Sequence, residues 1–126
     1  MVISDSRGRD PVKIAKPPFK PQPWTPADAT DSIRRMSLDE SLTVIWTRHA
    51  LDQMSDRELF TGDVLYILKQ GFVLDDPLVS TRPGFYKYSM VSRSPNSGSR
   101  TVRVVAIPDS ERFQMKIVTV MWADER

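Results

Sequence analysis

After Gly71 the sequence becomes a series of four strand-like segments joined by short turns, and no other feature constrains the fold as much. The segments cover residues 72–74, 85–93, 100–107 and 113–122. In the two middle segments hydrophobic residues alternate with polar or basic ones, which predicts strands with two different faces. The last segment is nearly continuous in apolar residues, as expected of a central strand buried on both sides. Strands that follow one another with hairpin-length connections favour an antiparallel meander.

The first half of the chain carries helix signals instead. Thr25-Pro26 has the form of an N-cap followed by a proline at the first helical position, and residues 27–35 are good helix formers. A short helix is predicted to follow a cap at Thr47, and the firmest helix follows a cap at Thr61 and ends at a left-handed Gly71. The predicted fold class is therefore α+β, with N-terminal helices packed on one face of an antiparallel, mostly meander sheet of about four to five strands. The other face of the sheet is expected to remain open.

The N-terminal 24 residues differ in composition from the rest of the chain. They are basic and hold five of the ten prolines, which favour extended backbone over helix. We predict a flexible basic arm over residues 1–24 and a single α+β domain over residues 25–126. Phe19 and Trp24 could anchor the arm on the domain, on a partner, or on neither. Residues 42–46 are β-branched and aromatic and favour a short strand, although their hydrophobicity could also continue a helix.

Composition excludes several classes of protein. The chain has no cysteine and one histidine, which excludes disulfides and thiolate metal sites and argues against zinc, so no cofactor or metal is expected. No apolar run approaches the roughly 18–20 residues that span a bilayer. The N-terminus lacks the basic and apolar regions of a signal peptide. We therefore expect a soluble cytoplasmic protein that has no membrane partner.

The charge is unevenly distributed along the chain. Residues 77–108 contain no Asp or Glu but five basic residues, whereas residues 28–63 have a net charge of −4. A solvated face normally mixes both signs, and an unmixed positive one is typical of a phosphate-binding surface. The basic residues are also common as ordinary solvent-facing strand positions. They are Arg82, Lys87, Arg93, Arg100 and Arg103.

A lone imidazole and these cations together supply the groups that RNA cleavage requires. Histidine suits proton transfer to or from the reacting oxygens, and arginine and lysine suit the phosphate. The predicted catalytic residues are His49, Arg57, Lys87 and Arg103. The predicted RNA-binding residues are Arg82, Tyr86, Tyr88, Arg93 and Arg100. The alternatives are that His49 is structural or solvated and that Arg57 pairs with Asp52, Asp56 or Glu58.

A short motif around the histidine resembles that of a known family. Thr47-Arg48-His49-Ala50, followed by Met54 and Arg57, is similar to the signature His-Ala-x-x-Arg-Met-x-x-Arg of a widespread family of small bacterial domains of unknown function. The resemblance covers roughly residues 42–122 and includes the helix that ends at Gly71. Gln53 stands where the family usually has an arginine, and a neutral amide cannot neutralise a phosphate.

That family is regarded as a distant relative of the RelE, ParE and BrnT toxins, which implies an α+β fold. RelE-type toxins cleave mRNA at the ribosome with basic and aromatic residues on the open sheet face. The resemblance implies that Lys87, Arg103 and Tyr88 carry the chemistry and that His49 and Arg57 line the same groove. We therefore predict a toxin-type protein acting on RNA, as a metal-independent endoribonuclease, with RNA or the ribosome and a cognate antitoxin as partners. The alternatives are a non-catalytic module that binds nucleic acid or protein, and a ParE-like inhibitor of a large enzyme such as gyrase.

Overall fold

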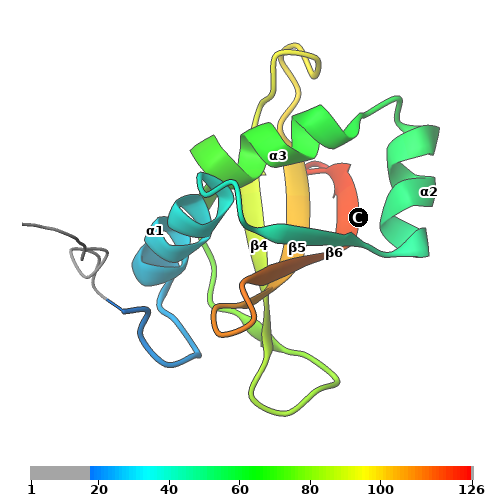
Figure 1. Ribbon diagram of the computed structural model, residues 1–126. Coiled ribbons are helices and arrows are strands. Elements are labelled where there is room, and N and C mark those ends of the chain that lie inside the picture. Colours follow the sequence, from blue (N-terminus) through cyan, green and yellow to red (C-terminus); the bar gives the residue numbers. More distant parts are fainter. Residues whose placement is uncertain (1–17, 126) are drawn as a thin grey trace, which may run out of the picture.

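A computed structural model of the chain describes residues 18–125, within which three helices and six strands form (Figure 1). The helices are α1 (Pro26–Ser37), α2 (Arg48–Asp56) and α3 (Thr61–Gln70). The strands are β1 (Thr43–Trp46), β2 (Phe72–Val73), β3 (Leu78–Val79), β4 (Tyr86–Ser92), β5 (Val102–Asp109) and β6 (Gln114–Trp122). The predicted α+β class is confirmed, and the helices precede most of the strands.

The sheet is mixed rather than wholly antiparallel. Its strand order is β1-β6-β5-β4-β2, with β3 also paired to β4. β4, β5 and β6 form the expected antiparallel meander. β1, however, pairs with β6 in parallel, with Thr43 opposite Gln114 and Trp46 opposite Ile117. A parallel pair needs a long connection between its strands, and here that connection contains α2, α3 and the other four strands.

Local chemistry explains where the helices begin and end. Thr25 and Thr47 cap α1 and α2 as expected, each accepting a hydrogen bond from the backbone N–H group three residues later. α3 begins at Thr61, so that residue is helical rather than the cap. Gly71 ends α3 in an extended conformation (φ −80°, ψ −175°), not the left-handed one we predicted. A glycine is needed there because a Cβ atom would lie 2.7 Å from the carbonyl oxygen of Ile67.

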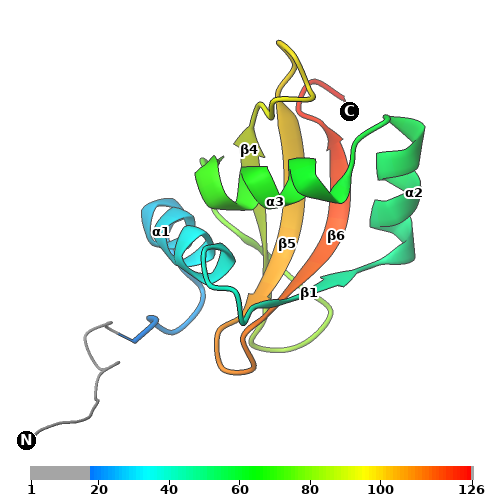
Figure 2. The ribbon, with the colours of Figure 1, turned by 45° about the horizontal axis from the view of Figure 1, so that its top comes forward.

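The helices cover one face of the sheet and leave the other open (Figure 2). α3 packs on β4 and β5, α1 packs on α3 and β2, and α2 packs on β6. The core beneath them is formed by the strand residues that point toward the helices. Its buried strand residues are Val73, Tyr88, Met90, Val102, Val104, Ala106, Met115, Ile117 and Val120.

The core also includes the end of the predicted arm. Trp24 is only 2% exposed, and its ring stacks on Tyr88 with 5.4 Å between centroids. Its backbone N–H donates to the Tyr88 hydroxyl at 2.9 Å, and the same hydroxyl donates to Oε1 of Gln22 at 3.2 Å. The domain therefore begins before residue 25, since an indole buried against the sheet belongs to the fold. Residues 1–17 of the predicted arm lie outside the described residues.

A buried carboxylate joins the loop between β4 and β5 to the start of α3. Asp63 accepts a hydrogen bond from the backbone N–H of Phe60 at 2.8 Å. It also accepts from Ser94 Oγ at 2.8 Å and from Asn96 Nδ2 at 3.1 Å. The carboxylate lies in the first turn of α3, where the helix dipole favours a negative charge. One side chain thus orders both the helix start and the loop.

Candidate nucleic-acid interface

The open face of the sheet carries three cationic side chains from three adjacent strands. Lys87, Arg103 and Lys116 alternate with residues that point into the core, so they project from the opposite side. In the strand register, Arg103 lies between Val91 on β4 and Met121 on β6. The cations therefore stand among apolar neighbours rather than among acids.

Lys116 lies in a second row of side chains on the same face. Its neighbours are Ile107 on β5 and Ile45 on β1. One carboxylate, Asp109, occupies an open-face position within the strands, at the end of β5. Its Oδ1 atom accepts hydrogen bonds from the backbone N–H groups of Glu111 and Arg112. That carboxylate is thus held by the turn that follows it.

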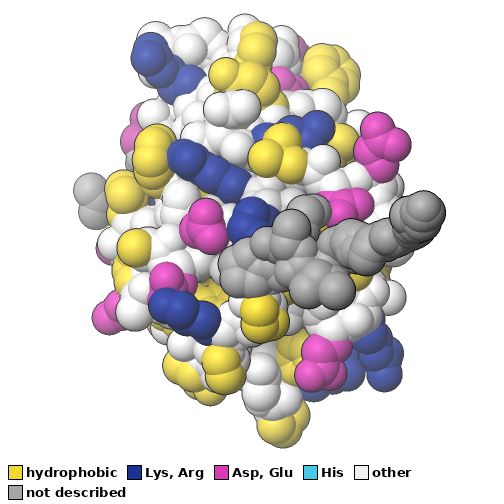
Figure 3. Space-filling view, turned by 60° about the vertical axis from the view of Figure 1, so that its left-hand side comes forward, with side chains coloured by type: hydrophobic (Ala, Val, Ile, Leu, Met, Phe, Trp, Pro, Cys, Tyr) yellow, Lys and Arg dark blue, Asp and Glu magenta, His cyan; other side chains and the backbone are white. Residues whose placement is uncertain are grey.

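None of the three open-face cations forms an ion pair within residues 18–125. Arg103 donates a long hydrogen bond of 3.3 Å to the carbonyl oxygen of Ala123, and it lines a hollow of about 340 Å³ whose one acid is Asp75. The face on the α1 side differs, because basic and acidic side chains are interspersed there (Figure 3). There Lys20 and Asp28 form an ion pair at 3.2 Å. The open face therefore keeps uncompensated positive charge.

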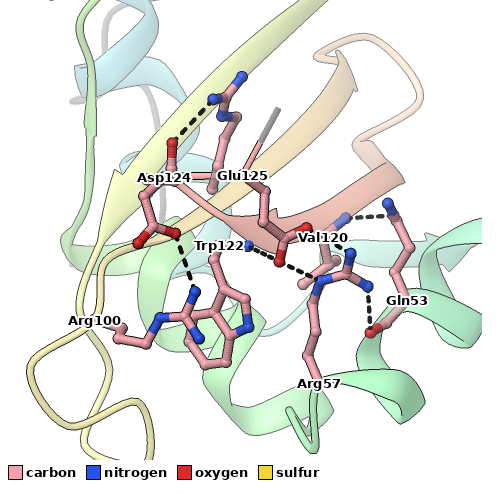
Figure 4. Close-up of polar contacts among 9 residues, drawn as sticks. Gln53, Arg57, Arg100, Val120, Trp122, Asp124 and Glu125 are labelled. Carbon is pink, nitrogen blue, oxygen red and sulfur yellow. Dashed lines mark hydrogen bonds and ion pairs between the residues drawn. The ribbon is translucent and has the colours of Figure 1, made fainter.

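The motif on α2 is mostly structural. Ala50 and Met54 are buried in the core. β1 pairs with only the first part of β6, and α2 covers the edge beyond it. The Thr47 hydroxyl donates to the carbonyl oxygen of Ile117 at 2.8 Å. Oε1 of Gln53 accepts from the backbone N–H of Val120 at 2.9 Å (Figure 4). An arginine has no acceptor and could not make the latter bond.

Arg57 is neutralised inside the protein. Its guanidinium binds Glu125 through two bonds, Nε to Oε2 at 2.9 Å and Nη2 to Oε1 at 2.6 Å (Figure 4). A third bond joins Nη1 to the carbonyl oxygen of Gln53 at 3.0 Å. The Arg57 and Glu125 side chains are 20% and 27% exposed. The hydrogen bond to Arg57 holds the pKa of Glu125 below its usual value, and the same bond raises the pKa of Arg57. The predicted phosphate-contacting role of Arg57 is thus not supported, since the Glu125 carboxylate already accepts from Nε and Nη2 of the guanidinium.

His49 has no structural role in the described fold. It is the second residue of α2 and is exposed to solvent. Within residues 18–125 its ring has no hydrogen-bond or ion-pair partner. It does not line the hollow at Arg103, and neither do Arg57 and Lys87. The four predicted catalytic residues are therefore not gathered in that hollow.

The predicted RNA-binding residues are divided between the two sides of the sheet. Tyr88 is fully buried, and burial raises the pKa of its phenol, so its ring has no face free to stack on a base. Tyr86 is half-buried on the same side. Arg100 pairs with Asp124 at 3.0 Å and lies 4.1 Å from the Trp122 ring centroid (Figure 4).

The other two predicted RNA-binding residues are exposed. Arg93 follows β4, and Arg82 lies in the loop between β3 and β4 with its guanidinium 4.3 Å from the Phe85 ring centroid. Sequence analysis missed Lys116, because its strand is nearly continuous in apolar residues. The signal that could have found it is its position between two core residues, Met115 and Ile117.

Fold and site together define an α+β domain with helices on one side of a mixed sheet and a basic, partly apolar surface on the other. Residues 46–122 match the model of the family described as Domain of unknown function (DUF4258). The match spans more than half of the chain, so the protein belongs to this family. No curated protein and no solved structure matches the chain. Within the described residues no helix is both long and apolar enough to cross a membrane, and no three His, Cys, Asp or Glu side chains are placed to hold a metal ion.

Proposed function

We propose that this protein binds single-stranded RNA through the open face of its sheet, as a RelE/BrnT-like toxin-type protein would. The observation that carries the proposal is the grouping of Lys87, Arg103 and Lys116 on that face without an ion-pair partner in residues 18–125. Four other cations of the described chain are paired with carboxylates. Cations left free on one surface are available to phosphates.

The neighbours of these cations favour single strands over duplexes. Unpaired bases stack on apolar and aromatic side chains, whereas a duplex presents mainly phosphates and grooves. Ile45, Ile107, Val91 and Met121 flank the cations. Phe72 extends the Arg103 row at the sheet edge, with the Arg34 guanidinium 4.4 Å from its ring centroid. Ser89 and Thr119 add hydroxyl groups on the same face. This mixture suits a strand whose bases are splayed out.

Salt dependence tests the proposal. If three cations contact phosphates, the affinity for a labelled single-stranded RNA should fall with a log–log salt slope of about −2, at about −0.7 per contact. Removing one open-face cation, as in Lys87→Gln, Arg103→Gln or Lys116→Gln, should reduce that slope by about 0.7. Fluorescence anisotropy over a salt series measures both quantities.

Arg48→Gln is the matched control, because Arg48 is an exposed cation of α2 that pairs with Asp52 rather than standing on the open face. It also removes one positive charge and should leave the slope nearly unchanged. Binding that ignores salt, or equal losses in all four variants, would contradict phosphate contact at this face.

RNA cleavage is a second candidate function, favoured by the solvent-exposed imidazole of His49. His49 would act as general acid or base, with one of the open-face cations on the phosphate. The test is cleavage of RNA in EDTA, alone or on ribosomes. A His49→Gln protein should bind RNA like the parent and fail to cut it. Intact RNA after incubation with the parent protein would leave binding as the function.

A cognate antitoxin is the proposed protein partner. Four large apolar side chains are exposed on β2, β3 and the loop between them, namely Phe72, Leu74, Leu78 and Val79. Clustered apolar exposure is typical of protein interfaces. An antitoxin that covered the neighbouring cations with acidic residues would compete with RNA. Co-expression with the product of an adjacent gene, followed by an RNA competition assay, tests this partner.

A further inference from the structure

A small hollow lies where the loop between β3 and β4 meets the far end of the open face. Its volume is about 220 Å³, and it is bounded by strands β1, β5 and β6 on one side and by residues 80–85 on the other. Sites for drug-sized ligands usually start at about 300 Å³, so this one suits a single planar ring system. Its lining combines apolar walls with a few polar groups, which is the composition of a ligand site.

The walls of the hollow are suited to a flat aromatic guest. Ile45 and Ile107 flank Lys116 in the strand register, so two aliphatic side chains form one wall. The loop contributes Phe85 and Arg82, which are already stacked, with the guanidinium 4.3 Å from the ring centroid. Guanidinium planes and aromatic rings are the surfaces on which proteins stack unpaired bases.

Hydrogen bonds within the loop hold this stacked pair in place. The Ser80 N–H donates to the Phe85 carbonyl oxygen at 3.1 Å, and the Phe85 N–H donates to the Arg82 carbonyl oxygen at 3.2 Å. The Arg82 N–H donates to the Ser80 hydroxyl at 3.1 Å. A wall that is ordered before binding costs less conformational entropy when a ligand arrives.

One polar group of the hollow, the carboxylate of Asp109, can accept a hydrogen bond from a ligand. Asp109 lines the hollow, and its Oδ1 is occupied by two backbone N–H groups of the following turn. Its Oδ2 accepts no hydrogen bond from the rest of residues 18–125. A fixed carboxylate oxygen favours a base that presents an amino group and disfavours one that presents a carbonyl. Gln114 lies opposite Asp109 in the register, and Lys116 supplies a cation for an adjoining phosphate.

We infer that this hollow is a subsite for one unpaired nucleobase that carries an exocyclic amino group, such as cytosine, in preference to uracil. The inference rests on the proposed RNA binding and adds a base preference to it. The base stacks on the free face of the Arg82–Phe85 pair, Asp109 accepts from its amino group, and Lys116 contacts the neighbouring phosphate.

Oligocytidine and oligouridine are the matched probes, because the two bases differ in the amino or carbonyl group at one edge. We expect the parent protein to bind oligocytidine about tenfold more tightly, the size of one well-placed hydrogen bond to a charged group. Asp109→Asn keeps an amide oxygen for the turn and replaces Oδ2 with a donor, so the preference should reverse towards oligouridine. Glu40→Gln, at an exposed site in the loop between α1 and β1, removes the same charge and should keep the parental preference.

A second variant and a second readout keep the inference testable if Asp109→Asn does not fold. Arg82→Gln removes an exposed stacking plane and should weaken binding of both probes. Cytidine 5′-monophosphate should shift the NMR methyl signals of Ile45 and Ile107 but not that of Ile33, a buried residue of α1.

The outcomes separate this inference from the proposed function. Equal affinity for the two oligonucleotides, with the salt slope retained, would overturn the subsite and leave RNA binding in place. Methyl shifts confined to the hollow, in a protein that showed no salt-dependent RNA binding, would uphold the base site and overturn the phosphate surface. Neither binding nor shifts would overturn both.

Discussion

Tyr88→Phe removes one buried oxygen atom and leaves the aromatic ring in the core. That oxygen accepts the backbone N–H of Trp24 at 2.9 Å and donates to Gln22 at 3.2 Å. It thereby joins β4 to the segment that precedes α1. The ring stacking between Tyr88 and Trp24 survives the substitution. The experiment therefore isolates the hydrogen bonds that attach this segment to the domain.

The expected loss follows from the burial of the Trp24 amide. A typical hydrogen bond contributes about 0.5–1.5 kcal/mol, but a buried donor left without an acceptor costs about 1–3 kcal/mol. The bond involving the Trp24 N–H is buried and the one to Gln22 is partly buried. We therefore expect the free energy of unfolding to fall by about 2 kcal/mol, within that range. In a domain of this size each kcal/mol lowers Tm by roughly 4 °C or somewhat more.

Urea unfolding followed by tryptophan fluorescence measures this loss, and the m value should not change because the folded surface stays the same. Tyr86→Phe is the matched control. Tyr86 lies two residues away on the same strand and is half-buried, and its hydroxyl makes no hydrogen bond within residues 18–125. If Tyr88→Phe cost no more than Tyr86→Phe, the hydroxyl would not hold the segment in solution.

Four further substitutions test the scaffold. Because the pKa of Glu125 is lowered by Arg57, the pair stabilises the fold above the unfolded-state pKa of about 4.3, and this contribution is lost as the pH falls through the lower folded-state pKa. Thermal melts should show a steeper loss below about pH 4.3 for the parent than for Arg57→Gln. Asp63→Ala leaves three donors without their acceptor and should cost about 2–3 kcal/mol in chemical unfolding, with faster amide exchange in the loop between β4 and β5. Gly71→Ala should lower the free energy of unfolding by about 1–3 kcal/mol, because its Cβ would clash with the backbone. Gly62→Ala meets no atom within 4 Å and should raise the free energy of unfolding by up to about 1 kcal/mol. Equal effects at the two glycines would contradict the packing at Gly71.

Local patterns predicted most of the fold because they act over a few residues. Alternation located β4 and β5 and a nearly continuous apolar run located β6, each to within two residues at either end, and the threonine caps located α1 and α2. The parallel pairing of β1 depends on contacts between residues 43–46 and 114–117. No local signal encodes a register between segments so far apart. The burial of Trp24 escaped prediction because proline-rich composition reports on backbone conformation and not on packing.

The site shows the same division between local and distant information. Alternation divided the strand residues into two sides, and the family resemblance assigned Lys87 and Arg103 to the open one. In the structure both lie opposite the core residues of their strands. The same alternation puts Tyr88 on the side opposite Lys87, so the two could not have lined one groove. A carboxylate partner for Arg57 was considered among its sequence neighbours, but the actual one lies 68 residues away. Such a pair forms only when the C-terminal end of β6 reaches α2.

Asp63 gives the two ends of the sheet different mechanical properties. At the end of the sheet near Asp63, one buried carboxylate holds both the connection between α2 and α3 and the loop from Ser94 to Ser97. Neither segment can open without exposing that charge. At the other end, the loop from Ser80 to Phe85 is held chiefly by bonds to itself. Local opening is cheapest where few buried contacts must break. Local opening should therefore begin in residues 80–85, while the Asp63 end stays closed.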